Sequence, residues 1–216
     1  MNHHQEIIDF IRINRVSTSQ IADCMNKSGV MPNIFPVNYG HHAVGSVSWI
    51  YAANNSNWSL HRDIQNVESS SIVLVSQVDC EDRALLGELV AKFLILYRQC
   101  SAVVVDGNIR DTNRIRKENW PVWCKSVSPV GCFNHEVDDS LVQDWVLQNR
   151  SKYNGTIAIC DDCGIVIIPH ELINSEMISK LCLIEENEDK WQLGINYHKK
   201  TTFQVICLNE CLDTIK

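Results

Sequence analysis

The pattern of apolar and polar positions predicts short helices and strands that alternate along the chain. Helical runs carry apolar residues three or four positions apart, whereas strand-like runs are continuously apolar or alternate with polar residues. Helices are expected at residues 6–13, 17–27, 59–66, 88–99 and 171–193. Strands are expected at residues 44–51, 71–78 and 121–127, from residue 102 onward, near residues 141–147, and in a hairpin over residues 156–168.

The order of these elements indicates the fold class. Hairpins are interleaved with helices, in place of a strict strand–helix–strand repeat, and this favours an α/β fold with a mixed sheet. A chain of 216 residues suits one domain, and 45% hydrophobic with 21% charged residues is ordinary for a globular protein. The sequence shows no internal repeat and no low-complexity linker that would divide it.

Several classes of partner are disfavoured by composition. No segment approaches the roughly 20 apolar residues of a membrane helix, and residues 1–6 lack the basic start of a secretory signal. We therefore expect a cytoplasmic protein without a membrane partner. A net charge of −7, without a basic stripe, argues against nucleic acid. The chain also lacks the glycine-rich loop, followed by an acidic residue, that a cofactor-dependent methyltransferase would show.

Ten cysteines are the most unusual feature of the composition. Without an export signal, they are expected as reduced thiols, most of them small buried apolar residues. Cys160-Asp161-Asp162-Cys163 has the C-x-x-C spacing of zinc and redox sites. The same residues also suit a tight turn, because Asp-Asp-x-Gly between two apolar runs is typical of a hairpin. We favour the hairpin.

A buried strand followed by a charged pair is the most informative segment. Val103–Val105 predicts a strand covered on both faces, and Gly107 is expected to turn the chain. Arg110 and Asp111 would then lie at the carboxyl end of the strand, where α/β proteins commonly bind ligands. A guanidinium binds a carboxylate in bidentate fashion, and a carboxylate can hold a divalent cation. The pair predicts a site for a small anion bridged to a metal; the alternative is an exposed ion pair.

The segment upstream makes this prediction more specific. A helix N-terminus at Gly87-Glu88-Leu89-Val90 is followed by the helix, the valine strand and the Arg-Asp pair. In the order of these elements, this part of the chain resembles the RraA-like family. This family includes the 4-hydroxy-4-methyl-2-oxoglutarate aldolases and the regulators of ribonuclease E activity. Further segments resemble the family in the same order, at residues 17–23, 44–47, 121–123 and 161–169, so the likeness extends over residues 10–195.

The resemblance implies a fold and an assembly. The fold would be a swivelling β/β/α sandwich, with mixed sheets flanked by helices, in a single domain of residues 1–197. Residues 198–216 would form a C-terminal extension to which no role is assigned. The resemblance also implies a homotrimer, or a hexamer built from trimers, with active sites between neighbouring subunits. The family's C-terminal helix lends an acidic residue to the neighbour, and Glu185 and Glu188 are the candidates here.

The resemblance further implies a metal-dependent carbon–carbon lyase. The substrate would be a 2-oxo acid, which undergoes retro-aldol cleavage of a 4-hydroxy-2-oxo acid or oxaloacetate-type decarboxylation through a metal-stabilised enolate. Asp111 would hold Mg²⁺ or Mn²⁺, and Arg110 would bind the substrate and stabilise the enolate. Backbone N–H groups would bind the substrate carboxylate at four positions: Gly87, Glu88, Leu89 and Val90. Glu88 would also hold metal-bound water and move protons; the alternative is an acid that merely favours a helix N-terminus.

Three departures from the family bear on function. Glu88 and Arg110 are separated by one residue more than in the metal-dependent aldolases, and the turn at 99–101 is expected to absorb it. Arg114 stands where many members have an acid, and Asn154-Gly155-Thr156 stands where Pro-Gly-Asp is usual. The alternative function is a non-catalytic RraA-like regulator that binds a protein partner such as a ribonuclease. Three further residues are candidates for either a substrate pocket or packing: Trp58, His61 and Trp123.

Overall fold

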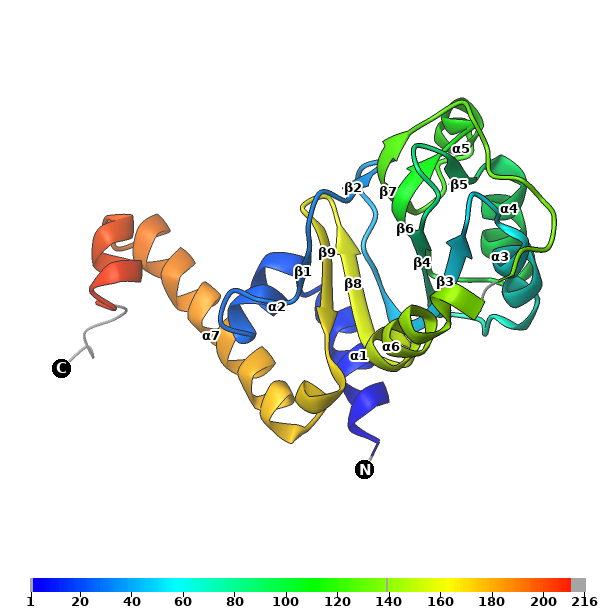
Figure 1. The fold of residues 1–216 in the computed structure, drawn as a ribbon. Helices are drawn as coiled ribbons and strands as arrows, with labels where there is room; N and C mark the ends of the chain where they lie inside the picture. Colours follow the sequence, from blue (N-terminus) through cyan, green and yellow to red (C-terminus); the bar gives the residue numbers. More distant parts are fainter. Residues whose placement is uncertain (1, 139, 211–216) are drawn as a thin grey trace.

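The computed structural model describes residues 2–138 and 140–210 (Figure 1). Its helices are α1 His3–Asn14, α2 Thr18–Cys24, α3 Trp58–Asp63, α4 Glu88–Lys92, α5 Thr112–Lys117, α6 Gln143–Tyr153 and α7 Ser175–Asn196. Short 3-10 turns lie at η1 Ile64–Asn66, η3 Ser140–Val142 and η4 His170–Leu172, and π turns lie at η2 Phe93–Tyr97 and η5 Phe203–Cys207. The strands are β1 Val30–Met31, β2 Phe35–Pro36, β3 Ala43–Ala53, β4 Ile72–Val78, β5 Ala84–Leu86, β6 Ala102–Ile109, β7 Val122–Val127, β8 Ile157–Asp161 and β9 Gly164–Ile168.

The long strand β3 belongs to two sheets. Its first half, residues 43–46, pairs antiparallel with β8, and β8 continues to β9 and β1. Its second half, residues 47–53, pairs in parallel with β4, which is followed by β6, β7 and β2, while β5 pairs with β6. Parallel strands are covered on both faces, which explains the unbroken apolar runs in β4 and β6. The predicted α/β fold with mixed sheets is confirmed.

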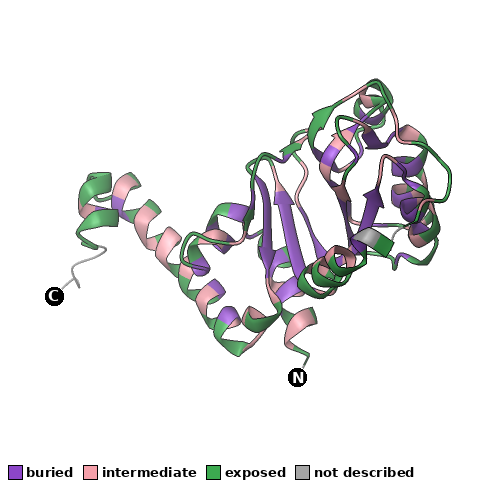
Figure 2. Ribbon diagram, viewed as in Figure 1, coloured by how far each residue is buried: buried purple, intermediate pink, exposed green. Residues whose placement is uncertain are grey.

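Alternating side chains of the parallel strands build two separate cores. Val103 and Val105 of β6 face α3, α4 and α5, whereas Val104 faces the β8–β9 hairpin and α6. The opposite face of the hairpin packs against α1, α2 and α7. Figure 2 shows the strands as the most continuously buried part of the chain. The layers therefore follow the order helices, sheet, sheet, helices, which agrees with the prediction of mixed sheets flanked by helices and adds a helical layer to the predicted β/β/α order.

The hairpin at the C-x-x-C segment is also confirmed. Cys160 is fully buried at the end of β8, and Cys163 is exposed in the turn. The Asp161 carboxylate accepts hydrogen bonds from the Cys163 N–H at 2.8 Å and from the Thr18 hydroxyl at 2.7 Å. Asp161 thus fixes the turn and anchors the start of α2, a structural role for this acid.

The strand expected near residues 141–147 is wrong, because this segment is helical. It forms η3 and α6, and four of its apolar residues pack against the hairpin core: Val142, Trp145, Val146 and Tyr153. Their spacing is close to the helical period, with one face toward the core. Most polar residues between them lie on the exposed face, as expected for a helix at the surface of the core.

The C-terminal helix begins later and extends further than residues 171–193. Asn174 caps it by accepting hydrogen bonds from the N–H groups of Glu176 and Met177, so α7 starts at Ser175. Gly194 does not end the helix; Val205 of η5 packs on it, where a Cβ would lie 3.1 Å from Val205 Cγ1. Within the part of the chain that the structure describes, no helix combines the length and apolar character needed to cross a membrane.

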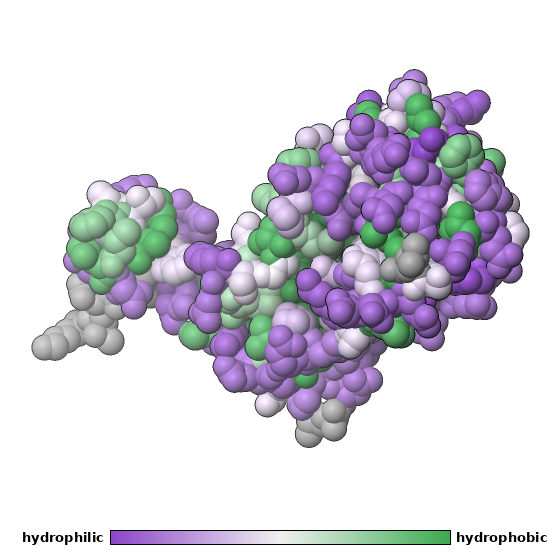
Figure 3. All heavy atoms as spheres, viewed as in Figure 1, coloured by the Kyte–Doolittle hydropathy of each residue, from purple (hydrophilic) through white to green (hydrophobic). Residues whose placement is uncertain are grey.

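The carboxyl half of α7 and η5 form an arm that leads away from the sheets (Figure 1). We call the end of this arm, residues 193–208, the arm tip. Figure 3 shows apolar side chains gathered there. Five large apolar residues of the arm tip are exposed: Leu193, Tyr197, Phe203, Ile206 and Leu208. The predicted extension 198–216 therefore forms part of a defined structure up to residue 210, and residues 211–216 lie outside the described residues.

Candidate active site

The strand β6 carries the Arg-Asp pair, but the chain does not turn at Gly107 as predicted. Gly107 lies inside β6, where the register with β7 shifts between Val105 and Asn108. A Cβ on Gly107 would lie 3.0 Å from the Leu85 side chain, so glycine permits close packing of β5 on β6. The chain turns at Asp111 instead, which has a left-handed backbone with φ of 58° immediately before α5.

Arg110 and Asp111 face each other at the end of β6. Arg110 Nε lies 3.6 Å from Asp111 Oδ2, and each side chain is 50% exposed. The Arg110 N–H donates to the Leu86 carbonyl at 3.0 Å, which ties the pair to the residue before Gly87. The Asp111 carbonyl accepts a hydrogen bond from the Arg114 N–H at 3.0 Å. The backbone around the pair is thus fixed while both charged groups stay accessible to a ligand.

Two glycines leave room for these side chains. A Cβ on Gly87 would lie 2.3 Å from Asp111 Oδ2, and a Cβ on Gly131 would lie 2.4 Å from Arg110 Nη1. Any larger residue would push the charged groups from their positions. Gly87 was predicted at the site from its place before α4. Gly131 was missed, because the sequence gives no indication that the loop after β7 reaches Arg110.

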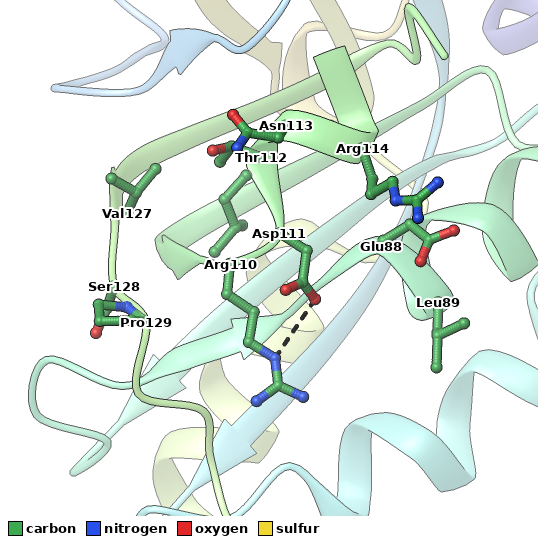
Figure 4. A pocket seen from close by; sticks show the side chains of 11 residues that line it. Glu88, Leu89, Arg110, Asp111, Thr112, Asn113, Arg114, Val127, Ser128 and Pro129 are labelled. Atoms are coloured by element: carbon green, nitrogen blue, oxygen red, sulfur yellow. Dashed lines mark ion pairs between the residues drawn. The ribbon is translucent and has the colours of Figure 1, made fainter. Parts of the chain in front are cut away.

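The pair forms the wall between two cavities. The larger, with a volume of about 680 Å³, is open and is lined by Glu88, Leu89, Ile109, Arg110, Asp111, Thr112, Asn113, Arg114, Val127, Ser128 and Pro129. Figure 4 shows residues 127–129 across from Glu88 and Leu89, with the charged pair between them. The smaller, of about 180 Å³, shares Leu89, Arg110 and Asp111 with it. All the predicted residues from Gly87 to Val90 line one or both cavities.

The smaller cavity contains a polar array from two distant loops. Asn134 Nδ2 donates to Asn57 Oδ1 at 2.9 Å and lies 3.4 Å from His61 Nε2. Asn57 Nδ2 donates in turn to the Leu85 carbonyl at 3.0 Å. Burial lowers the pKa of His61, so its imidazole is neutral at pH 7. Asn57 and Asn134 were not identified from the sequence, because only tertiary contact brings them to Arg110.

The three aromatic or imidazole candidates have different locations. His61 lines the smaller cavity beside Arg110. Trp123 is fully buried in the core between the sheets, and its Nε1 donates to the Asp161 carbonyl at 2.8 Å. Trp58 is 42% exposed at the start of α3 and is not among the lining residues of either cavity.

The donor set fits a hydrated divalent ion. Asp111 offers one accessible carboxylate, and Glu88 lines the same cavity. The described residues contain no group of three or more His, Cys, Asp or Glu that could enclose a metal ion. Mg²⁺ retains several waters and binds through one or two carboxylates, so these residues suit Mg²⁺ or Mn²⁺ better than an ion that needs a complete protein cage.

The helix that follows Gly87 is irregular in the interval between Glu88 and Arg110. After α4 it continues as the π turn η2, in which the Arg98 N–H donates to the Phe93 carbonyl at 3.0 Å. A π turn contains more residues than an α turn, and such turns frequently lie at functional sites. The irregularity thus starts within the helix and leads into Gln99, which has a left-handed φ of 57°. The turn predicted at residues 99–101 directly follows this π turn.

The other departures from the family pattern lie at different places relative to the cavities. Arg114 lines the larger cavity and gives it a second cation. Asn154 lies at the end of α6, where its side chain accepts a hydrogen bond from the Trp49 N–H at 3.1 Å. Glu185 and Glu188 lie on α7 and accept hydrogen bonds from Gln20 at 2.8 and 2.9 Å. Helix α7, which carries both glutamates, lies on the other side of the sheets from α4 and α5 (Figure 1).

Comparison with known sequences gives a family match and two relatives. A family model described as RraA-like, Aldolase/RraA, matches residues 18–167. Protein DlpA of Legionella pneumophila is 23% identical over 193 residues, which are 86% of this chain and 31% of DlpA. A Halalkalibacterium halodurans protein that carries the name of a 4-hydroxy-4-methyl-2-oxoglutarate aldolase is 26% identical over 130 residues, 57% of this chain and 60% of that protein. The chain thus spans less than two thirds of either relative.

Solved structures show the same fold. A protein from Pseudomonas syringae pv. tomato superposes with a TM-score of 0.73 at 19% identity, over 94% of each chain. RraAS2 of Streptomyces coelicolor, described as an unusual member of the RNase ES inhibitor RraA protein family, superposes with a TM-score of 0.65 at 18% identity. That match covers 84% of this chain and 94% of RraAS2. At such low identity the likeness concerns the fold alone.

Proposed function

Because the chain belongs to the RraA-like family, whose model matches residues 18–167, we propose that it is a divalent-metal-dependent lyase acting on 2-oxo acids. The family description covers both aldolases and RraA proteins, so the local chemistry decides between them. The observation that carries the proposal is the placement of Arg110 and Asp111, accessible and paired, on the wall between two cavities. Residues at the N-terminus of α4 line the same two cavities.

The two cavities suit the two ends of such a substrate. Gly87, Leu89 and Val90 line the smaller cavity, and the first N–H groups of a helix have no partner within the helix. Together with the Arg110 guanidinium they suit the carboxylate of a 2-oxo acid. The remainder of the substrate then extends into the larger cavity, where Arg114 and Glu88 lie.

Glu88, Arg110 and Asp111 each have a separate role in the proposed bond cleavage. Glu88 accepts the proton of the 4-hydroxyl group in a retro-aldol reaction, and the electron pair of the broken bond passes to the 2-oxo acid fragment. The Arg110 guanidinium stabilises the negative oxygen that develops on that fragment. Asp111 holds the divalent ion, which when bound supplies Lewis-acid stabilisation of the same charge. Oxaloacetate-type decarboxylation needs the same stabilisation without a base.

We also propose that the active form is a trimer or hexamer. Two exposed apolar surfaces support this: the arm tip, and a face of α4 and η2 formed by Leu89, Leu96 and Tyr97. Exposed apolar surfaces of this kind mark protein contacts. Glu185 and Glu188 lie on the protruding α7, where they can approach the cavities of a neighbouring subunit but not their own.

A direct assay tests the proposed lyase. The purified protein is incubated with oxaloacetate and with several 4-hydroxy-2-oxo acids, and pyruvate release is followed with chelator and with added Mg²⁺ or Mn²⁺. We expect release that chelator stops and the metal restores. Activity that persists after exhaustive chelation contradicts the metal role. Inactivity of a folded protein across the whole panel contradicts the lyase and favours the regulator that binds a ribonuclease-like partner.

A further inference from the structure

One cysteine lines the smaller cavity, and a second interacts with it from the adjoining core. Cys132 lines the cavity next to Gly131 and is partly buried, so it is accessible from the cavity. Cys80 is fully buried in the core beneath α3 and α4, and Cys132 packs against this same core. The proposed lyase reaction makes no use of either thiol.

The backbone holds the two cysteines in fixed segments. The Cys132 N–H donates to the Ala84 carbonyl at 3.1 Å, and the Arg83 N–H donates to the Cys80 carbonyl at 3.0 Å. The Arg83 side chain then crosses between the segments, because its Nη1 donates to the Gly131 carbonyl at 3.1 Å. The loop of residues 80–84 and the loop of residues 131–132 are therefore tied together on either side of the thiols.

The electrostatic surroundings distinguish Cys132 from the other buried thiols. The side-chain interaction with Cys80, with the charges of Arg83 and Arg110, lowers the pKa of Cys132, whereas the same interaction and burial raise the pKa of Cys80. Burial instead raises the pKa of Cys100 and that of Cys124 to about 11. A thiolate is the reactive form of cysteine, so reactivity is concentrated at the one thiol of the pair that faces the cavity.

We propose that Cys132 is a modification site for hydrogen peroxide, with Cys80 as the resolving thiol that closes a disulfide beside Arg110. The Cys132 sulfur attacks the peroxide O–O bond, forming an S–OH group and releasing water once the leaving oxygen takes up a proton. The Cys80 thiol then displaces this hydroxyl, which leaves as a second water. One peroxide is reduced and two thiols are oxidised to one disulfide.

The location links this modification to the proposed function. An oxygen on Cys132 would occupy part of the smaller cavity, whose volume is about 180 Å³. A disulfide would join residue 80 to the residue after Gly131, the glycine against which the Arg110 guanidinium lies. If the proposed function holds, oxidation stops turnover and a thiol reductant restores it.

The test measures the modification itself, so it does not depend on lyase activity. The reduced full-length protein is treated with limiting hydrogen peroxide, remaining thiols are alkylated, and the peptides are analysed by mass spectrometry. We expect a peptide pair joined through Cys80 and Cys132, which disappears on reduction. Cys80→Ser should accumulate a dimedone-trapped sulfenic acid at Cys132, and Cys132→Ser should leave Cys80 unoxidised. Cys80→Ala replaces Cys80→Ser if the serine destabilises the core.

Matched controls come from the exposed cysteines. Cys163→Ser removes an exposed thiol of the hairpin turn and should leave the Cys80–Cys132 disulfide yield unchanged. Oxidation of Cys163, Cys182 or Cys207 before Cys132 overturns the proposal, because exposure alone would then determine reactivity. A stable sulfenic acid at Cys132 in the unmodified sequence, without a bond to Cys80, overturns the resolving role.

Discussion

Arg110 is confined by its neighbours more than its 50% exposure suggests. Its Nε faces Asp111, its Nη1 fills the space that a side chain on Gly131 would take, and its backbone N–H bonds to Leu86. A guanidinium held in this way is preorganised for a planar anion. Asp111 has a left-handed backbone, and it lines both cavities.

The roles of Arg110 and Asp111 can be distinguished by substitution. Asp111→Asn keeps the size and removes the charge that holds the metal, so metal affinity should fall and activity should partly return at high metal concentration. Arg110→Lys keeps the charge but loses the planar fork, so turnover or substrate affinity should fall by the equivalent of roughly 2–4 kcal/mol, the scale of an oxyanion-stabilising donor. Isothermal titration with Mn²⁺ and steady-state kinetics measure both. If both variants form a folded oligomer with the metal affinity and kinetics of the wild type, the Arg110–Asp111 pair has a structural role only.

Gly131→Ala displaces the guanidinium without removing it. The added Cβ would lie 2.4 Å from Arg110 Nη1, so the arginine side chain must move while the core is untouched. We expect activity to drop at least tenfold, about 1.4 kcal/mol in transition-state stabilisation, with an unchanged melting temperature. Val130→Ala, in the same loop, changes an exposed residue that lines neither cavity, so it is the matched control and should retain activity. Full activity of Gly131→Ala would show that the position of Arg110 is not limiting.

The sequence identified the charged pair and the residues from Gly87 to Val90 because they stand next to each other or at a recognisable helix start. It did not identify Gly131, Asn57 or Asn134. These residues come from loops that are separate in the sequence, and their relation to Arg110 depends on the pairing of Ala84 with Val130 and Cys132. Local patterns carry no information about such long-range pairing.

At the scale of elements, the helix formed by α4 and η2 positions the site through one buried face. Leu94 is fully buried against the parallel sheet, whereas Leu96 is 52% exposed. Leu94→Ala should lower the free energy of unfolding by about 2–5 kcal/mol, because it leaves a cavity in the core. Lys92→Ala, at an exposed polar position of the same helix, should change it by about 0.5 kcal/mol or less. Urea denaturation of both variants measures the difference, and equal losses would contradict the orientation of the π turn.

Element prediction succeeded where one pattern dominated. The unbroken apolar runs of β4 and β6 and the turn residues between β8 and β9 left little choice of structure. It failed at α6, whose apolar residues are few, and at Gly107, where glycine serves packing against Leu85 and not a turn. In both cases a neighbouring element decides the local conformation, and that neighbour is distant in the sequence.

At the scale of the whole molecule, the arm tip predicts an assembly. Light scattering at micromolar concentration should give the mass of a trimer or hexamer, and a mass near 24.6 kDa would contradict the proposed shared site. The double substitution Phe203→Ser with Ile206→Ser should weaken association, because it removes exposed apolar surface from the arm tip. His198→Ser, at an exposed polar position of the same segment, should leave the mass unchanged.

The shared strand β3 also determines when the chain can finish folding. Its second half pairs with β4 soon after both have been synthesised, but its first half waits for β8, which begins at Ile157. Contacts of such large sequence separation form slowly. A nascent chain that ends before β8 can complete its parallel sheet while the backbone of residues 43–46 stays an open edge, and such edges pair with other chains. Arrested translation before Ile157 is therefore expected to yield aggregates, even though most of the residues around Arg110 have already been made.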